Sequence, residues 1–463
     1  MSNAITTPRK ELEPLKNTFR GGIHPETHKE LTRDLPLRPI EAKGEMVFPL
    51  LQHIGKPAVP LVKKGDAVLV GQRIAEADGF VSAHVTSSVS GRVKAIEKRR
   101  VQNGQMAECI VIENDGAYTE IAGIGVRCDV SGLTPEEILQ RIRDAGIVGL
   151  GGAGFPTHVK LSPKDPSAIR YLIANGSECE PYLTCTDQLM RTESSAIVEG
   201  LELMLRLFPN AEGVICIEDN KPEAITAMQQ AVNGKTKLRV FPCQAKYGQG
   251  GEKMLIETIA GVFYPASMLP ADVGCIVQNV CTIYAIERAV VFREPLYRHV
   301  FTLTGDTVAS PGNFLVREGM SFAELLEEAG GLKEGACPRK AIVGGPVMGM
   351  AIPNLTVPIQ KTSSGVALVS VDESEVAEGK MTSCLRCGRC TTVCPVGLLP
   401  QLMAEAVAMG DLERYEKKLY GLECLACGCC GFICPAKRPL VQTFMSTKAE
   451  ILSRKRAQEG GKK

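Results

Sequence analysis

Short apolar runs broken by glycine fill the region from about Phe48 to Ile112, and a different pattern follows in the middle of the chain. There, β-branched and apolar runs alternate with helix-like segments. The runs RYLIANG, GVICIED and KLRVFP read as strands, with helices around Leu189 to Leu207 and from about Pro222 between them. This alternation predicts α/β organisation, in which ligands bind at the carboxyl ends of strands.

For one helix, the sequence contains signals for both its start and its end. Thr134 is placed to be the N-cap, Pro135 occupies the first helical position, and Glu137 completes a capping box. Gly146 is the expected stop. We therefore expect a helix between these residues.

Three features are expected beyond the α/β region. The segment FAELLEEAG predicts a short helix that packs through Phe322, Leu325 and Leu326. Residues 371–380, VDESEVAEGK, are polar and acidic enough to form a linker. From Lys448 the chain turns basic and ends in GGKK, and we expect this tail to be disordered or to touch a partner.

Composition limits the class of protein. A length of 463 residues predicts about three or four domains. The 53 basic and 52 acidic residues nearly balance, so no overall field favours nucleic acid as a partner. The polar N-terminus lacks the apolar core of a signal peptide, and no run of roughly 18 apolar residues occurs. If the protein serves a membrane, we expect it to dock to other subunits.

Eighteen cysteines are present, and eight of them form two copies of one spacing, C-x2-C-x2-C-x3-C-P. The remainder are scattered, as expected of thiols in a reducing compartment. The repeated spacing is typical of two-cluster bacterial ferredoxins, in which the fourth cysteine of each motif ligates the other cluster. It predicts two [4Fe-4S] clusters, one held by Cys384, Cys387, Cys390 and Cys434 and the other by Cys424, Cys427, Cys430 and Cys394.

A pair of zinc sites is the alternative, but structural zinc requires neither the offset third cysteine nor the proline. Cys429 adds a ninth thiol to this region, and its simplest interpretation is a packed, inert cysteine.

A glycine-rich run, GLGGAGFPTHVK, spans residues 149–160. Without side chains, such a loop lets backbone N–H groups approach a ligand, although a tight connecting loop would have the same composition. A second glycine cluster, YGQGGEK, follows the run KLRVFP. The polar and glycine residues just past predicted strand ends are Asn175, Glu178, Glu180, Gly248, Gly250, Gly251 and Glu252.

The region around VKKGDAVLVGQRIAEADGF resembles the barrel-sandwich fold of lipoyl and biotinyl carriers. Asp78, Gly79 and Phe80 occupy the hairpin that carries the modified lysine in those carriers, so no lysine is available there. A structural or docking role is expected instead, because a fold does not carry its function with it.

Taken together, GLGGAGFPTHVK, NGSECEPYLTCTDQLMR, YGQGGEK and QNVCT resemble the flavin and nicotinamide site of the complex I flavoprotein subunit. With FRGGIHP at 19–25, PLLQHIGKPAVPLVKKGD and the tandem cysteine motifs, they match the C-subunit family of Rnf complexes more closely, from Phe19 to about Phe444. This resemblance implies a peripheral NADH-handling subunit of an ion-translocating ferredoxin:NAD oxidoreductase complex. It also implies non-covalent FMN, NAD(H) as substrate, and electrons passed between NAD(H), FMN, the two clusters and partner subunits.

The resemblance further implies partners that include integral-membrane subunits and an iron-sulfur subunit, and a place on the cytoplasmic face of the bacterial inner membrane. It assigns no catalytic side chain. The residues that it assigns to cofactor binding are Gly149, Gly151, Gly152, Gly154, Lys160, Asn175, Glu178, Glu180, Gly248, Gly250, Gly251, Glu252, Asn279 and Thr282.

Each of these residues also has an ordinary structural interpretation. Lys160 alone would be a solvated helix residue, the acidic pair Glu178 and Glu180 a solvated turn, and Asn279 with Thr282 a helix cap. Two positions depart from the complex I pattern: Ser177 replaces an aspartate and Lys253 a glutamate. Both changes make the site less negative.

The predicted fold class is multidomain α/β plus α+β. The predicted parts are a tail at 1–20, a barrel-sandwich domain at 21–128, a Rossmann-like FMN/NADH domain at 129–294, an SLBB-like β-grasp module at 295–370, the linker at 371–380, an α-helical two-cluster ferredoxin domain at 381–447 and a basic tail at 448–463. Three alternatives stay open: a cobalamin reductase, a soluble diaphorase subunit of a hydrogenase or formate dehydrogenase, and a non-enzymatic electron-relay scaffold.

Overall fold

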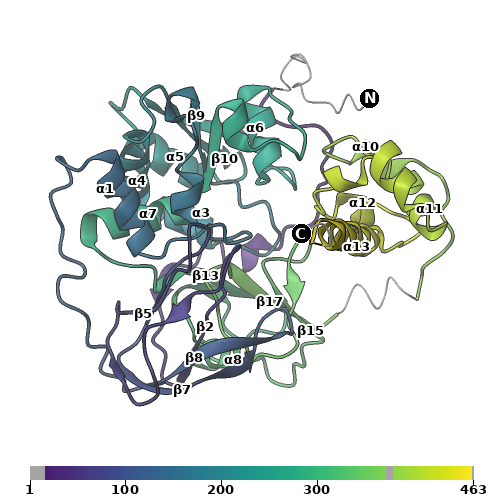
Figure 1. Cartoon of the computed structure of the whole chain (residues 1–463). Helices are drawn as coiled ribbons and strands as arrows, with labels where there is room; N and C mark the ends of the chain where they lie inside the picture. The colour runs from purple at the N-terminus through teal and green to yellow at the C-terminus, as the bar shows by residue number, and fades with distance from the viewer. Residues whose placement is uncertain (1–15, 372–378, 461–463) are drawn as a thin grey trace. The chain divides into compact units, whose positions relative to one another are not determined.

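The computed structural model describes residues 16–371 and 379–460, which form two compact units (Figure 1). The cysteine-rich unit takes its described residues from Met1–Glu26, Cys243–Val273 and Asp372–Lys463. The large unit comprises Thr27–Pro242 and Gly274–Val371. Most of the tail predicted at 1–20 and most of the linker predicted at 371–380 lie outside the described residues.

Residues 243–273 group with the cysteine-rich unit and not with the α/β region in which the sequence placed them. Hydrogen bonds to segments near the two ends of the chain explain this grouping. The Tyr247 N–H donates to the Ile23 carbonyl at 2.9 Å, and the Ala266 N–H donates to a Glu423 carboxylate oxygen at 2.7 Å. These bonds join parts of the chain that no local sequence signal connects.

Two small antiparallel sheets occupy the first part of the large unit. One has the order β2-β8-β7-β4, with β2 at Glu45–Pro49, β8 at Met106–Asn114, β7 at Gly91–Arg100 and β4 at Ala67–Val68. The other has the order β3-β5-β6, with β3 at Val59–Pro60, β5 at Arg73–Glu76 and β6 at Val85–Thr86. These strands supply the β-rich region expected between Phe48 and Ile112.

A six-stranded mixed sheet occupies the last part of the large unit, in the order β1-β14-β13-β17-β15-β16. Its strands are β1 at Leu37–Pro39, β13 at Arg298–Thr304, β14 at Gly312–Arg317, β15 at Lys340–Val343, β16 at Met350–Ala351 and β17 at Gly365–Val369. Helix α8, Phe322–Glu328, starts at Ser321, whose hydroxyl accepts the Glu324 N–H at 3.1 Å. Phe322, Leu325 and Leu326 are buried, which confirms the predicted packing face of this helix.

One hydrophobic core serves both of these regions. Phe48 and Ile110 of the small sheets belong to the same buried cluster as Phe301 of the six-stranded sheet and Phe322 of α8. The modules predicted at 21–128 and 295–370 therefore do not have separate cores. The small sheets and the six-stranded sheet are therefore stabilised by packing against each other.

A four-stranded sheet with the order β11-β10-β9-β12 forms the α/β region. Its strands are β9 at Tyr171–Asn175, β10 at Glu212–Glu218, β11 at Leu238–Cys243 and β12 at Cys275–Asn279. Strand β9 pairs in parallel with both β10 and β12. The chain runs from β9 through β10 to β11 on one side and then returns to place β12 on the other, so the strand order reverses between β9 and β12. Ligands of open α/β sheets bind at this kind of reversal, outside the carboxyl ends of the strands.

Helices cover this sheet (Figure 1). Helices α3 at Cys185–Thr192 and α4 at Ser194–Leu205 connect β9 to β10, and α5 at Pro222–Ala231 connects β10 to β11. Helices α1 at Pro135–Asp144 and α2 at Thr157–Lys160 precede β9, and α7 at Val280–Phe292 follows β12. The Thr134 cap, the capping box and the left-handed Gly146 beyond the helix end confirm the predicted limits of α1. The helix expected from Leu189 to Leu207 is instead α3 followed by α4, because Glu193 between them leaves helical geometry with φ −120° and ψ 29°.

The cysteine-rich unit is helical in its described residues beyond 379. Its helices are α10 at Arg389–Thr392, α11 at Pro400–Ala408, α12 at Cys429–Phe432 and α13 at Leu440–Gly460, and α6 at Glu252–Ala260 comes from the middle of the chain. Met403, Tyr415 and Phe444 are buried in a small core, against which the cysteines pack.

Helix α13 changes the interpretation of the C-terminal region. The tail from Lys448, expected to be disordered or to touch a partner, is helical as far as Gly460, so disorder is wrong over those residues and the predicted boundary at 447/448 falls inside a helix. Lys448 explains part of this order, because its ammonium donates to the Leu422 carbonyl at 2.8 Å. Throughout 16–371 and 379–460, no helix is both long and apolar enough to cross a membrane.

Candidate functional site

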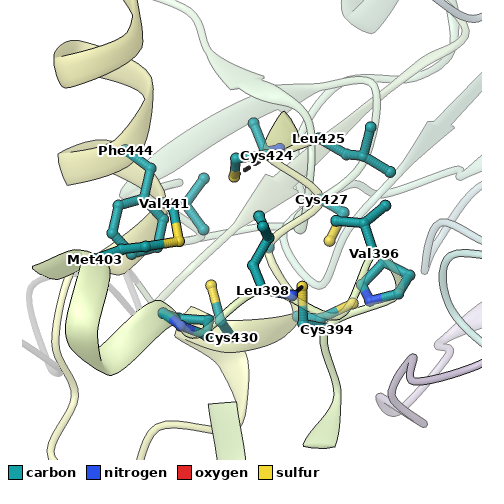
Figure 2. A pocket seen from close by; sticks show the side chains of 15 residues that line it. Cys394, Val396, Leu398, Met403, Cys424, Leu425, Cys427, Cys430, Val441 and Phe444 are labelled. Carbon is teal, nitrogen blue, oxygen red and sulfur yellow. Dashed lines mark hydrogen bonds between the residues drawn. The ribbon is translucent and has the colours of Figure 1, made fainter. Parts of the chain in front are cut away.

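A cavity in the cysteine-rich unit brings thiols from both cysteine motifs together (Figure 2). Cys394 of the first motif lines it together with Cys424, Cys427 and Cys430 of the second, and Cys429 lines it as well. The lining thus includes the four cysteines predicted for one of the two clusters. The rest of the lining is largely apolar and includes Leu398, Val441, Met403 and Phe444.

The two motifs repeat one backbone geometry. Arg386 and Ala426 both have φ +54°, and the glycines that start α10 and α12, Gly388 and Gly428, are both left-handed. The Arg386 N–H donates to the Cys384 sulfur and the Ala426 N–H to the Cys424 sulfur, each at 3.4 Å. Backbone N–H groups aimed at cysteine sulfur are one of the means by which proteins set the potential of an iron-sulfur cluster.

The other predicted group of four is more accessible. Cys384 and Cys387 are exposed, whereas Cys390 and Cys434 are partly buried. Burial raises the pKa of the Cys390 thiol, and the charge of Cys434 acts in the same direction. In the parts of the chain that the structure describes, no three Cys, His, Asp or Glu side chains are arranged to hold a single metal ion.

Cys429 is fully buried, as expected of a packed cysteine, but it also contacts a predicted ligand. A side-chain hydrogen bond with Cys429 lowers the pKa of Cys427 to about 7, against the opposing effect of burial. The sequence placed Cys429 two residues after Cys427 but did not predict this interaction.

The glycine-rich loop lies between α1 and α2 in the large unit. Its ends are closed by the Gly149 N–H, which donates to the Phe155 carbonyl at 2.9 Å. Gly151 and Gly152 are exposed, and a Cβ at Gly152 would meet open space. Gly154 is different, because it has φ +68° and a Cβ there would lie 2.7 Å from the Thr362 methyl. Only glycine fits that position without a shift of its neighbours.

The loop lies beside the place where the strand order reverses. Asn175 ends β9 and Asn279 ends β12, and the two are direct partners in the parallel register. The Leu150 N–H donates to the Thr282 hydroxyl at 2.9 Å, and a Cβ at Gly151 would lie 3.6 Å from the Asn279 amide nitrogen. The structure thus brings together the glycine-rich loop, both asparagines and Thr282.

Asn279 also has the ordinary role considered from the sequence. Its side-chain oxygen accepts the Cys281 N–H at 2.8 Å and caps α7. The capped N-terminus of this 13-residue helix opens at the same edge of the sheet. Lys160, by contrast, is the last residue of α2 and is partly buried.

The acidic pair is held by backbone groups, so its interpretation as a solvated turn is wrong. The Glu178 carboxylate accepts the N–H groups of Thr186 at 2.7 Å and Asp187 at 3.2 Å, at the start of α3. The Glu180 carboxylate accepts the N–H groups of Val347 at 3.2 Å and Met348 at 2.9 Å. Each carboxylate therefore has a fixed orientation.

Two buried lysines, which the sequence did not identify, hold the backbone of this acidic segment. The Lys29 ammonium donates to the carbonyls of Glu178 at 2.9 Å and Glu180 at 3.0 Å. The Lys221 ammonium donates to the Ser177 carbonyl and to the Glu218 carboxylate, both at 2.7 Å. Burial lowers the pKa of Lys29, whereas the neighbouring carboxylates overcome the effect of burial and raise the pKa of Lys221.

The second glycine cluster lies in the cysteine-rich unit. Gly248 has φ +104° and packs against Phe19, since a Cβ there would lie 3.0 Å from its ring. Gly250 precedes Gly251, which is the N-cap of α6, and Glu252 is the first residue of that helix. Lys253 pairs with Glu423 at 3.5 Å.

Comparison with known families gives three matches along the chain. Residues 17–117 match the RnfC barrel sandwich hybrid domain, residues 142–288 match the Nuo51 FMN-binding domain, and residues 300–351 match the SLBB domain. The segment 243–273, which the structure groups with the cysteine-rich unit, lies inside the second match.

Curated relatives match nearly the whole chain. The C subunit of the proton-translocating ferredoxin:NAD(+) oxidoreductase complex of Clostridium ljungdahlii is 43% identical over 94% of this chain and 94% of the relative. The C subunit of the Na(+)-translocating ferredoxin:NAD(+) oxidoreductase complex of Acetobacterium woodii is 40% identical over 95% and 98%. The C subunit of the ion-translocating oxidoreductase complex of Rhodobacter capsulatus is 40% identical over 95% and 85%.

Among solved structures, an NAD+-reducing [NiFe]-hydrogenase in the air-oxidized state aligns with a TM-score of 0.48 and 21% identity. The alignment covers 68% of this chain and 62% of that chain. A likeness at this level does not bear on function.

Proposed function

This chain belongs to the RnfC family, and we propose that it is the peripheral NADH-handling subunit of an ion-translocating ferredoxin:NAD oxidoreductase complex. In this role it passes electrons between NAD(H), FMN and two [4Fe-4S] clusters and on to partner subunits. The observation that carries the proposal is the placement of the glycine-rich loop, Asn175 and Asn279 at the point where the strand order reverses. The relatives are named as subunits of oxidoreductase complexes, which does not favour a cobalamin reductase, a soluble diaphorase or a relay scaffold.

The flavin site proposed here is built from loop backbone and a helix N-terminus. The exposed Gly151 and Gly152 leave room for a planar ring to approach the backbone. The N-terminus of α7, beside Asn279 and Thr282, supplies the N–H groups and positive end of a helix dipole that suit the flavin phosphate. The residues of the large unit proposed for FMN and NAD(H) are Gly149, Gly151, Gly152, Gly154, Lys160, Asn175, Glu178, Glu180, Asn279 and Thr282. Gly248, Gly250, Gly251 and Glu252, which belong to the cysteine-rich unit, are proposed for cofactor binding on the sequence resemblance alone.

The clusters proposed here use the cysteines in the crossed arrangement. Cys394, Cys424, Cys427 and Cys430 would hold one, in the largely apolar cavity; Cys384, Cys387, Cys390 and Cys434 would hold the other, at a more exposed position. The thiol sulfurs, the N–H groups aimed at them and the apolar lining all suit such a group. Flavin connects the two kinds of carrier, because nicotinamide exchanges electrons in pairs and an iron-sulfur cluster exchanges them singly.

The residues of the chain orient and protect these groups. Lys29 and Lys221 fix the segment that carries Glu178 and Glu180, so both carboxylates are positioned before a dinucleotide arrives. Such preorganisation reduces the entropy lost on binding. Met403, Phe444 and Leu398 keep water away from the enclosed thiols.

The proposal includes the finer fold and cellular assignments. It identifies the small sheets as a barrel-sandwich domain, the α/β region as Rossmann-like, the six-stranded sheet as an SLBB-like β-grasp module and the cysteine-rich helices as a two-cluster ferredoxin domain. It places the protein on the cytoplasmic face of the bacterial inner membrane, bound to integral-membrane subunits and to an iron-sulfur subunit.

Flavin removal tests the proposed route. The full chain is purified anaerobically, its flavin is removed with its iron retained, and reduction of the clusters by NADH is followed optically. Reduction should be lost without flavin and return when FMN is added. Unchanged reduction by the flavin-free protein would show that the route does not pass through flavin. Protein that contains iron but neither binds FMN nor reduces ferricyanide with NADH would favour the relay scaffold.

A further inference from the structure

A loop of the six-stranded sheet lies along the glycine-rich loop. Its residues, called here the QKTSSG loop, are Gln360, Lys361, Thr362, Ser363, Ser364 and Gly365. The last of them, Gly365, is the first residue of β17. The QKTSSG loop falls outside the stretches matched to the Nuo51 FMN-binding domain and to the SLBB domain. Nothing in either match assigns it a role.

The QKTSSG loop contacts the glycine-rich loop at two points and the chain just before it at a third. The Lys361 ammonium donates to the carbonyl of Gly146, which precedes the glycine-rich loop, at 2.7 Å. In the middle, a Cβ built at Gly151 would lie 3.9 Å from the Ser364 Cβ. At the end, a Cβ built at Gly154 would lie 2.7 Å from the Thr362 methyl. The QKTSSG loop therefore lies against two glycines of the glycine-rich loop and binds the chain just before it.

Lys361 connects three parts of the large unit. Its side chain is buried, and its ammonium donates to the His84 carbonyl at 2.8 Å as well as to the Gly146 carbonyl. His84 belongs to the small sheets, Gly146 to the α/β region and Lys361 to the six-stranded sheet. Burial lowers the pKa of Lys361, and the fully buried Glu318 acts in the opposite direction.

The QKTSSG loop is itself rigid, because side chains from several elements bind it. The Ser363 hydroxyl accepts the Gln102 amide at 2.5 Å, and the Ser363 carbonyl bonds with the His299 ring at 2.8 Å. The Lys361 N–H donates to the Gln52 side chain at 3.1 Å. A loop fixed in this way can restrict the conformations of the flexible glycine-rich loop beside it.

We propose that the QKTSSG loop supports the flavin site from behind the glycine-rich loop, where Lys361 and Thr362 are positioning residues that set the shape of that loop for FMN. This inference rests on the proposed function. A loop with four glycines among six residues loses much conformational freedom when it binds a ligand. The QKTSSG loop removes part of that freedom beforehand, so flavin affinity depends on residues that do not touch the flavin.

The test compares variants of the full chain for FMN affinity, measured anaerobically by quenching of FMN fluorescence as flavin-free protein is added. Thr362→Ser removes the methyl that packs against Gly154 and should weaken FMN binding about threefold. Thr362→Val keeps a methyl at that place and should bind FMN as the unmodified chain does. Lys361→Met should weaken binding about tenfold or more, since it removes both ammonium hydrogen bonds.

Arg317→Met is the matched control. Arg317 is also a buried cation that connects the six-stranded sheet to the small sheets, through a 2.7 Å bond to the Ser88 carbonyl, but it does not contact the glycine-rich loop. It should lower thermal stability and leave the FMN dissociation constant unchanged. If Lys361→Met does not fold, the Thr362→Ser and Thr362→Val pair decides, because Thr362 is only partly buried.

The outcomes separate the two proposals. If the unmodified chain binds no FMN, the proposed function fails. If it binds FMN and the Thr362→Ser and Lys361→Met variants bind equally well, the positioning role is refuted. The same refutation follows if Thr362→Val weakens binding as much as Thr362→Ser, or if Arg317→Met weakens it as much as Lys361→Met.

Discussion

Exchange of the fourth cysteine between the motifs can be tested by counting iron in paired variants. The structure places Cys394 on the cavity lined by Cys424, Cys427 and Cys430, although Cys394 belongs to the other motif in sequence. If these four hold one cluster, then Cys394→Ala and Cys424→Ala damage the same cluster. Each single variant should keep the other cluster intact.

The expected iron content follows from that grouping. Two [4Fe-4S] clusters carry about eight irons per chain, and loss of one ligand set leaves about four. The double variant Cys394→Ala/Cys424→Ala should also keep about four irons, because both changes fall on one cluster. The double variant Cys424→Ala/Cys434→Ala should fall toward zero, because its changes fall on different clusters.

The assay is iron and acid-labile sulfide content after anaerobic reconstitution, with electron paramagnetic resonance of the reduced protein to count the remaining cluster types. The two double variants act as controls for each other, since both remove two thiols from the same unit. If Cys394→Ala/Cys424→Ala lost nearly all iron while Cys390→Ala/Cys394→Ala kept about half, each motif would hold its own cluster and the crossed arrangement would be refuted.

Two further predictions concern the large unit. Glu287, on α7, is 2% exposed, and burial raises its pKa to about 7. The pKa of Glu287 is higher in the folded state than in the unfolded state, so the contribution of this carboxyl to stability is present at low pH and is lost as pH rises toward 7. Glu287→Gln, which cannot ionise, should therefore be more stable to urea than the unmodified chain at pH 8, by up to about 3 kcal/mol. At pH 5 the difference should be less than about 1 kcal/mol. An equal difference at both pH values would contradict this assignment. Glu178→Ala should lower the free energy of unfolding by about 1–2 kcal/mol, because two N–H groups at the start of α3 lose their acceptor; Glu223→Ala, at an exposed first-turn glutamate of α5, is the control, and equal losses would refute the capping role.

Local signals predicted the local structure well. The Thr134 cap and Pro135 are adjacent residues with strong preferences, and α1 begins where they indicate. The crossed grouping of the cysteines follows from the geometry of the motif and stays a prediction, although the four thiols of one predicted group do line one cavity together with Cys429. The continuous helix expected after Leu189 was wrong, since a break at Glu193 carries no glycine or proline to mark it.

Contacts across long stretches of chain were not predictable from one sequence. Lys29 binds carbonyls about 150 residues away in the chain, and Lys361 binds one that is 277 residues away. The sequence next to either lysine does not distinguish it from a lysine on a solvated surface. The grouping of 243–273 with the cysteine-rich unit depends on contacts of the same kind. Burial of a charge is decided by the whole fold, so the residues that hold the candidate site in place become visible only in three dimensions.

The make-up of the cysteine-rich unit from three separated stretches bears on its biosynthesis. Residues near the start of the chain bond to Val393 and Tyr247, and helix α13 lies near the end. A ribosome working at about 5–20 residues per second releases these stretches many seconds apart, so the earliest must wait, unassembled, until the last has emerged. If the proposed clusters form, iron and sulfide would therefore be inserted only into a completed polypeptide, and we expect nascent chains arrested before residue 440 to remain without metal.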